Sequence, residues 1–347
     1  MAVELLEPVQ IGNYSLQSKV VMAPMTRGFA NDLGIIHPDT INYYKIRAFY
    51  GVGMIITEGI SISKEAQGTV GIPGLYTLRQ VEAWKDVTKE VHKAGGLIIA
   101  QLWHVGRLSH SYFTGGTKPI APSAVQANGQ THNIRMPYET PRPMTITDIE
   151  RTIADFAAAA ENAMNAGFDG VEIHAAHGYL IDQFQSYITN LRKDEYGQKK
   201  FLFLEQIIKA VGNSIGIDKV IVRFSEHKDD LPLYYWENPE DTVQEILNVF
   251  YKTGISLIHP SSPSFKKPLT NHTLTLHALI RKYWNKASIG VGEMTPNIAE
   301  EAISSSEIQL AAFARPLLAN PDMVELLKRS TPLKKYHPET HLSTLLP

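Results

Sequence analysis

Residues 147–175 read TDIERTIADFAAAAENAMNAGFDGVEIHA, and this stretch contains one helix followed by one strand. Thr147 and Glu150 have the spacing of a capping box, after which apolar residues recur at helical spacing until Gly167. The run GVEIHA at 170–175 then predicts a strand, one of several short runs along the chain whose apolar character is mostly continuous and not alternating. That pattern is typical of strands in parallel sheets covered by helices. We therefore expect an α/β fold.

The same unit recurs along the chain. Eight short runs rich in Val, Ile, Met and Gly are each followed by a stretch with helical spacing. We expect strands at 19–26, 54–61, 97–104, 170–175, 219–225, 255–260, 287–293 and 308–315.

Such alternation produces either a closed barrel or an open doubly wound sheet. The open sheet usually carries a glycine-rich turn after its first strand, but here that strand ends in APMTR at 23–27. The one GxG near a strand end is at 290–292, on the seventh strand, where barrels often bind phosphate. We predict a single (β/α)8 TIM barrel that spans residues 1–347 as one domain. Residues 108–145, rich in Gly, Pro, Ser, Thr and Asn, are expected to form an excursion over the barrel mouth after the third strand.

The composition excludes several classes of function. The net charge of −2 and the lack of a long Lys/Arg run argue against nucleic acid as a partner. The chain has no signal-peptide pattern at its start and no apolar run near the ~20 residues that a membrane span needs, so we expect a cytoplasmic protein without a membrane partner. There are no cysteines, which removes disulfides, thiol nucleophiles and iron–sulfur clusters. Any redox chemistry then depends on a bound organic cofactor.

Polar residues gather where the predicted strands end, which is where barrel enzymes place their catalytic groups. They are Thr26, Glu58, Gln101, His104, His174, His177, Tyr179, Arg223, His259, Gly292 and Arg315. Glu172, His174 and His177 suggest one alternative, a metal-dependent barrel hydrolase. Against it, only the two histidines need converge, because we place His177 beyond the end of its strand. We therefore expect no metal.

Five segments of the sequence resemble the motifs of one known family. APMTR (23–27), ITEG (56–59), QLWHVGR (101–107), EIHAAHGYL (172–180) and ARPLLANPD (314–322) resemble the Old Yellow Enzyme family of FMN-dependent ene-reductases. The likeness covers nearly the whole chain and keeps the order and spacing of the family's motifs.

The resemblance implies an FMN site. Thr26 would contact the flavin O4, and the backbone around Pro24 and Gly59 would lie against the ring. Gln101 would pair with the pyrimidine edge and Arg223 would stand by N1 and O2, where reduced flavin gathers negative charge. The phosphate site of the family matches Gly292, Glu293, Ala314 and Arg315.

The resemblance also implies a reaction. His174 and His177 would hold a carbonyl or nitro oxygen of the substrate, Tyr179 would donate a proton, and Trp103 and Thr69 would line the pocket. The expected enzyme uses NADPH or NADH to reduce activated C=C bonds in enones, enals and nitroalkenes, or nitro compounds. A flavin-binding protein without turnover is a further alternative.

The sequence departs from the family pattern at three places. Thr69 stands where many members have Tyr, and Ala314 replaces the usual Gly. The segment after Gly197 is about three residues shorter than usual, so the family's local loop structure and any subunit contact there are not carried over. The natural substrate, the choice between NADH and NADPH, and whether the protein is a homo-oligomer are not set by the sequence.

Overall fold

A computed structural model describes residues 4–345 of the chain, and its centre is a closed barrel of eight parallel strands. Around the barrel the strands follow the order β10-β11-β12-β3-β4-β5-β8-β9. Their bounds are β3 Val20–Met22, β4 Met54–Ser61, β5 Leu97–Trp103, β8 Gly170–His177, β9 Val220–Lys228, β10 Leu257–Ser261, β11 Ala287–Gly290 and β12 Leu310–Phe313. The predicted (β/α)8 barrel and all eight predicted strands are confirmed.

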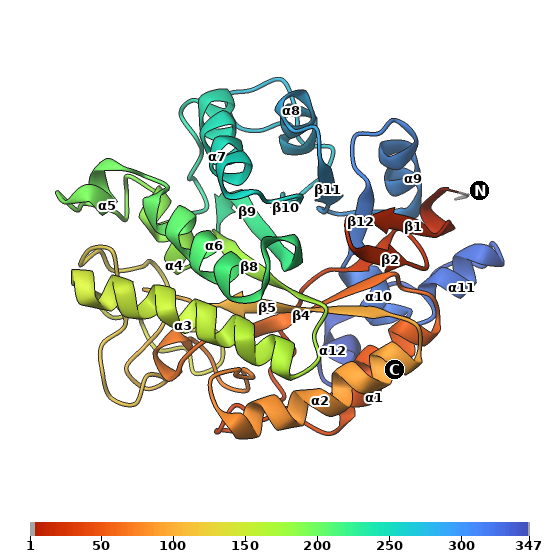
Figure 1. Cartoon of the computed structure of the whole chain (residues 1–347), viewed down its shortest axis with the longest axis horizontal. Helices are drawn as coiled ribbons and strands as arrows, with labels where there is room; N and C mark the ends of the chain where they lie inside the picture. Colours follow the sequence, from red (N-terminus) through yellow and green to blue (C-terminus); the bar gives the residue numbers. More distant parts are fainter. Residues whose placement is uncertain (1–3, 346–347) are drawn as a thin grey trace.

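Helices surround the barrel on the outside, as Figure 1 shows. The longer ones are α1 Asp39–Phe49, α2 Leu78–Lys93, α3 Ile146–Asn165, α6 Leu202–Ile215, α7 Pro239–Thr253, α8 Leu276–Tyr283 and α9 Pro296–Ser304. The shorter ones are α4 Leu180–Gln185, α5 Glu195–Gln198, α10 Arg315–Ala319, α11 Met323–Lys328 and α12 Pro338–His341, with 3₁₀ turns η1 Glu4–Leu6, η2 Lys64–Ala66 and η3 Ile217–Lys219. Their apolar faces and the outer faces of the strands form the larger of the hydrophobic cores.

Helix α3 begins two residues earlier than the capping-box pattern predicted. Its capping box joins Thr145 and Asp148 and not Thr147 and Glu150. Asp148 also accepts two hydrogen bonds from Arg142, at 2.6 and 3.0 Å, and this fixes the carboxylate at the start of the helix. Both pairs have capping-box spacing, and the added Arg142 contact is a tertiary feature that spacing does not reveal.

A hairpin that we did not predict closes one end of the barrel. Its strands are β1 Val9–Ile11 and β2 Tyr14–Leu16, which pair antiparallel. Tyr14 and Leu16 pack against inward-facing residues of the barrel strands in a core of their own. A Cβ on Gly170, the first residue of β8, would lie 2.4 Å from the Tyr14 hydroxyl. The hairpin therefore plugs the barrel at the amino ends of its strands.

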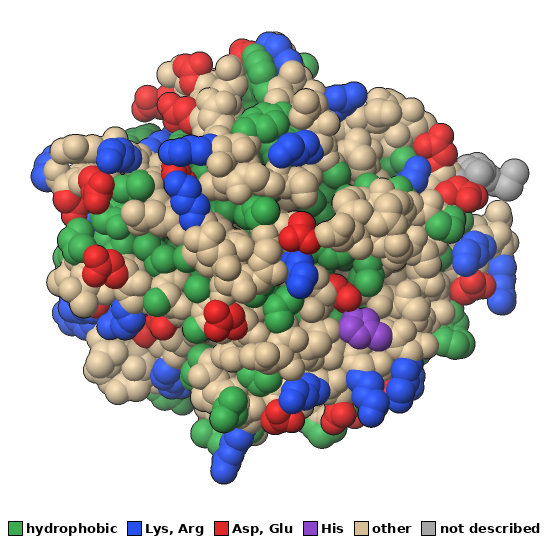
Figure 2. Space-filling view, in the orientation of Figure 1, with side chains coloured by type: hydrophobic (Ala, Val, Ile, Leu, Met, Phe, Trp, Pro, Cys, Tyr) green, Lys and Arg blue, Asp and Glu red, His purple; other side chains and the backbone are tan. Residues whose placement is uncertain are grey.

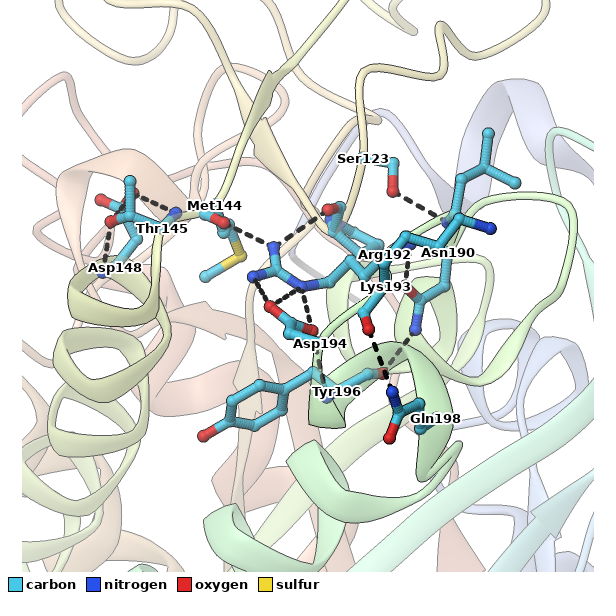
Figure 3. Close-up of polar contacts among 12 residues, drawn as sticks. Ser123, Met144, Thr145, Asp148, Asn190, Arg192, Lys193, Asp194, Tyr196 and Gln198 are labelled. Atoms are coloured by element: carbon cyan, nitrogen blue, oxygen red, sulfur yellow. Dashed lines mark hydrogen bonds and ion pairs between the residues drawn. The ribbon is translucent and has the colours of Figure 1, made fainter.

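The excursion after the third barrel strand is confirmed as a long, mostly irregular segment. It contains β6 Ile120–Ala121 and β7 Arg142–Pro143, which form a small parallel pair. Arg192 fastens it to the segment that precedes α5 (Figure 3). The guanidinium of Arg192 donates to the carbonyl oxygens of Pro122 and Met144, at 3.2 and 2.5 Å, and to the carboxylate of Asp194. One side chain thus ties the excursion to the barrel.

Candidate active site

The end of β8 carries the central residues of the site. His177 has φ +60° and Gly178 has φ +81°, so the backbone turns through the left-handed region immediately after the strand. A histidine in that region costs about 1–2 kcal/mol, which a site can retain for function. We expected His177 to lie beyond the strand, but it is the last residue of β8. The turn brings His174, His177 and Tyr179 together.

The rings of these residues form one cluster with Trp103. The centroid of His174 lies 5.2 Å from that of His177 and 5.1 Å from that of Tyr179. The Trp103 ring lies 4.9 Å from Tyr179, edge to face. All four come from the carboxyl ends of β5 and β8 or the turn beyond. The structure therefore assembles the predicted substrate-contacting residues in one place.

Several buried side-chain nitrogens at the mouth have no hydrogen-bond partner within the described residues. They are Nδ1 of His174, Nε1 of Trp103 and Nε of Arg223, whose residues are each 7% exposed or less. A buried donor without a partner costs about 1–3 kcal/mol. Unpaired donors are therefore expected where a ligand supplies the acceptors, and this set fits a ligand rich in carbonyl groups and ring nitrogens.

A polar network lies inside the barrel between neighbouring strands. Glu172 accepts from Gln101 at 2.8 Å, and its other oxygen lies 2.6 Å from Nδ1 of His259. Burial alone would raise the pKa of Glu172, but the charge and hydrogen bond of His259 leave that pKa lowered. Arg223 is the register neighbour of both His174 and His259, and it donates to Ser261 at 3.1 Å. Gln101 and Arg223 are thus each held by a hydrogen bond to a neighbouring strand.

The two histidines are electrically neutral at ordinary pH. Burial, and then the charge of Arg223, hold the pKa of His174 well below its usual value. The same two causes lower the pKa of His177, whose Nε2 lies 2.9 Å from the Ser261 hydroxyl. Burial, and then the charge of Asp229, raise the pKa of Tyr179 well above normal. The cluster therefore presents neutral imidazoles beside a phenol that retains its proton.

Three of the predicted flavin-ring contacts, Pro24, Thr26 and Gly59, lie near the carboxyl ends of β3 and β4. Thr26 is exposed and lies in a loop, four residues after β3 ends, so our placement of it on the strand was wrong. Pro24 has no N–H, so it cannot extend the hydrogen-bonded ladder. A Cβ on Gly59 would lie 2.5 Å from the Trp103 ring, so Trp103 itself requires glycine there.

The predicted phosphate-binding residues lie beyond two neighbouring strands, β11 and β12, which are in register at Gly290 and Ala311. Gly292 has φ +131°, and a Cβ there would lie 2.5 Å from the carbonyl oxygen of Ser262. Glu293 also has positive φ, and Arg315 is exposed at the start of α10. These strands were predicted to run through Glu293 and Arg315, but they end earlier, at Gly290 and Phe313. Tight backbone and a free guanidinium at adjacent strand ends suit a phosphate group.

A cavity of about 220 Å³ opens beside this cluster. Trp103 and Tyr179 line one part of it, and Thr69 lines it as predicted. The excursion supplies a further part through Asn128, Gly129, Gln130, His132 and Tyr138. The Thr69 hydroxyl is buried and has no hydrogen-bond partner within the described residues.

The metal alternative is not supported by the geometry. Both oxygens of Glu172 are engaged inside the barrel by Gln101 and His259, so Glu172 does not converge with His174 and His177. Residues 4–345 contain no group of three or more His, Asp or Glu placed to hold a metal ion.

Sequence reasoning missed two residues at the site. Ser261 lies one residue beyond the predicted sixth strand, and it joins His177 to Arg223. Asp229 accepts a hydrogen bond from the Tyr179 hydroxyl at 3.3 Å. The run EHKDD at 226–230 was a possible signal, because so many charges close to a strand end in the mouth need a reason.

Fold and site together define a flavin-dependent oxidoreductase on a TIM barrel. Residues 4–334 match the model of the NADH:flavin oxidoreductase / NADH oxidase family, and the chain belongs to that family. It is an FMN-dependent enzyme of the Old Yellow Enzyme type that takes NAD(P)H as reductant.

Named relatives agree with this placement. The chain is 37% identical to 12-oxophytodienoate reductase 2 of Arabidopsis thaliana, over 98% of this chain and 92% of that one. The Old Yellow Enzyme homologue of Zymomonas mobilis has a solved structure with a TM-score of 0.90 at 34% identity, covering 98% and 96% of the two chains. Morphinone reductase in complex with tetrahydroNAD gives a TM-score of 0.88 at 32% identity, covering 98% and 94%.

Proposed function

We propose that this enzyme reduces activated C=C bonds in enones, enals or nitroalkenes, or reduces nitro compounds. The observation that carries the proposal is the cluster of His174, His177 and Tyr179 beside the cavity, in which the ring centroid of His174 lies 5.2 Å from that of His177 and 5.1 Å from that of Tyr179. Two imidazole donors suit an oxygen that gains negative charge, and the phenol suits a carbon that needs a proton.

Two groups of residues would hold FMN. Pro24, Thr26, Gly59, Gln101 and Arg223 would surround the ring, and Gly292, Glu293, Ala314 and Arg315 would hold the phosphate. When bound, FMN would supply the hydride-transfer chemistry that links NAD(P)H to the substrate. The unpaired Nε of buried Arg223 supports this assignment, because a buried cation needs an acceptor.

The chain's own residues perform the remaining tasks. His174 and His177, held neutral by their lowered pKa values, donate N–H groups to the carbonyl or nitro oxygen of the substrate. Tyr179 keeps its proton because its pKa is raised, and releases it to the α-carbon as charge develops there. Trp103 and Thr69 shape the wall of the cavity.

We infer further that the chain acts as one domain and works in the cytoplasm. The barrel strands run from Val20 to Phe313, so neither half of the chain closes a barrel alone. No helix within residues 4–345 is long and apolar enough to cross a membrane. Basic and acidic side chains are interspersed over the face drawn in Figure 2, which does not favour a nucleic-acid partner. A homo-oligomer stays a prediction.

Two half-reactions measured separately test the proposal. The purified protein is expected to be yellow, to be bleached by NADPH or NADH without oxygen, and to regain its colour when 2-cyclohexenone is added. The saturated ketone is the expected product. Bleaching that no enone or nitro compound reverses would overturn the proposed substrate class.

A further inference from the structure

The cavity beside Tyr179 has an acidic edge formed by two consecutive carboxylates, Asp229 and Asp230. The negative charge of Asp230 is balanced by Arg107, because the two form a buried ion pair. Both side chains are 3% exposed or less. Asp229 differs from its neighbour, since 43% of its side chain is exposed. The carboxylate of Asp229 accepts a hydrogen bond from the Tyr179 hydroxyl and contacts Nε2 of His227, each at 3.3 Å.

Within residues 4–345, no Lys or Arg side chain forms an ion pair with Asp229. Lys228, next to it in sequence, turns away into a buried ion pair with Asp182 at 2.5 Å. Burial works against ionisation of Asp229, but the hydrogen bond from His227 helps to leave its pKa lowered. Arg223 also acts on it through its charge, yet Arg223 is buried and hydrogen-bonded to Ser261. Asp229 is therefore a carboxylate at neutral pH.

The rest of the cavity wall suits a cation. Trp103, Tyr138 and Tyr179 line it, and aromatic faces attract cations. Among the described lining residues there is no Lys or Arg, and His132 is the one histidine. A carboxylate among aromatic rings attracts ammonium groups and repels carboxylates.

We propose that Asp229 makes this site selective for alkenes or nitro compounds that carry a cationic group, such as an amine, and disfavours those that carry a carboxylate. The inference rests on the proposed function, because it takes this cavity as the place where substrate lies. A bound cation would also offset the negative charge that faces Tyr179. The proton of Tyr179 would then leave more easily, so the cationic group would favour turnover as well as binding.

Binding of three matched phenols to the FMN-loaded enzyme tests the proposal. Their para substituents are trimethylammoniomethyl, its neutral isostere neopentyl, and carboxymethyl, and the change in flavin absorbance gives each Kd. We expect the cationic phenol to bind about fivefold more tightly than the neutral one, and the anionic phenol about fivefold more weakly, as for a partly exposed ion pair.

Two variants assign the selectivity to one carboxylate. Asp229→Asn should bring the ratio of the cationic to the anionic Kd close to one. The matched control is Asp32→Asn, which removes the same charge from a neighbouring cavity that shares Thr69, and should leave the ratio unchanged. A ratio that survives Asp229→Asn would overturn the proposal.

Salt provides a measurement that needs no variant. Raising the ionic strength from about 0.01 to 0.5 M should bring the ratio of the cationic to the anionic Kd closer to one in the wild-type enzyme, because a partly exposed charge is screened. Equal binding of all three phenols at low salt would overturn the selectivity alone. If neither neutral 2-cyclohexenone nor any other neutral enone or nitro compound is reduced, the proposed function itself fails, so the two failures are distinguishable.

Discussion

Two polar regions of this molecule treat their hydrogen bonds in opposite ways. Around Arg192, the guanidinium nitrogens find acceptors in Asp194 and in the carbonyls of Pro122 and Met144. At the barrel mouth, His174, Trp103 and Arg223 each keep a buried nitrogen without a hydrogen-bond partner in the described residues. In the first region, the polar groups form hydrogen bonds that hold segments of the chain together. In the second region, they are available to a ligand, which is what a binding site requires.

The largest expected effect comes from Tyr179→Phe at the mouth. The phenylalanine keeps the ring that packs on Trp103 but has no proton to donate. We expect alkene reduction to slow by about 100- to 10,000-fold, the range for a general acid, with flavin reduction by NAD(P)H nearly intact. Stopped-flow absorbance of the two half-reactions checks this. Equal slowing of both would refute the role of Tyr179.

His174→Ala separates binding from stability. Removing an N–H that is aimed at a ligand should weaken phenol binding by about 100-fold, or roughly 3 kcal/mol. Because Nδ1 of His174 is buried and unpaired, no hydrogen bond of that atom is lost from the folded protein. Flavin titration gives the affinity and thermal unfolding gives the stability. Unchanged phenol affinity would remove His174 from the oxygen-holding pair.

Glu58 is a mixed case, a carboxyl at the mouth that is buried yet paired. Burial raises its pKa to about 7, although it accepts hydrogen bonds from the backbone of Arg27 and Gly28. The pKa of Glu58 in the folded protein lies above the unfolded value of 4.5, so protonation of this carboxyl stabilises the folded state. That stabilisation is fully present below pH 4.5 and is lost as pH rises through 7.

Glu58→Gln should remove that dependence. The wild type should lose up to about 3 kcal/mol relative to the variant between pH 4.5 and pH 8, at 1.36 kcal/mol for each pKa unit. Urea unfolding of both proteins across this range measures the difference. Parallel curves for the two proteins would show that Glu58 does not titrate as its burial predicts.

Arg192→Ala should lower the stability of the protein, whereas His174→Ala should weaken phenol binding. It leaves the carbonyls of Pro122 and Met144 without their donor, so we expect about 2 kcal/mol of lost stability, near 1 kcal/mol for each hydrogen bond. Phenol affinity should change little. Thermal unfolding with the same flavin titration tests both statements, and Arg192→Lys, which keeps the charge but not the fork, is the matched control.

The sequence predicted the barrel well because buried parallel strands are continuous apolar runs, as in MIITEGIS at 54–61. Strand ends were less predictable, because an end depends on pairing with a neighbour, and residues such as Thr26 and Arg315 fell outside their strands. The hairpin at 9–16 was missed because its strands are three residues long. Ser261 and Asp229 were missed because their partners come from other segments of the chain, which one sequence does not reveal.

The plug formed by the amino-terminal hairpin has a consequence for traffic through the enzyme. Tyr14 and Leu16 fill the end of the barrel at the amino ends of its strands, so the proposed site is open only toward the mouth among the described strands. In the proposed function, NAD(P)H and the substrate would both bind at this mouth, one after the other. An excess of either would then compete with the other, so a high concentration of NAD(P)H would slow turnover.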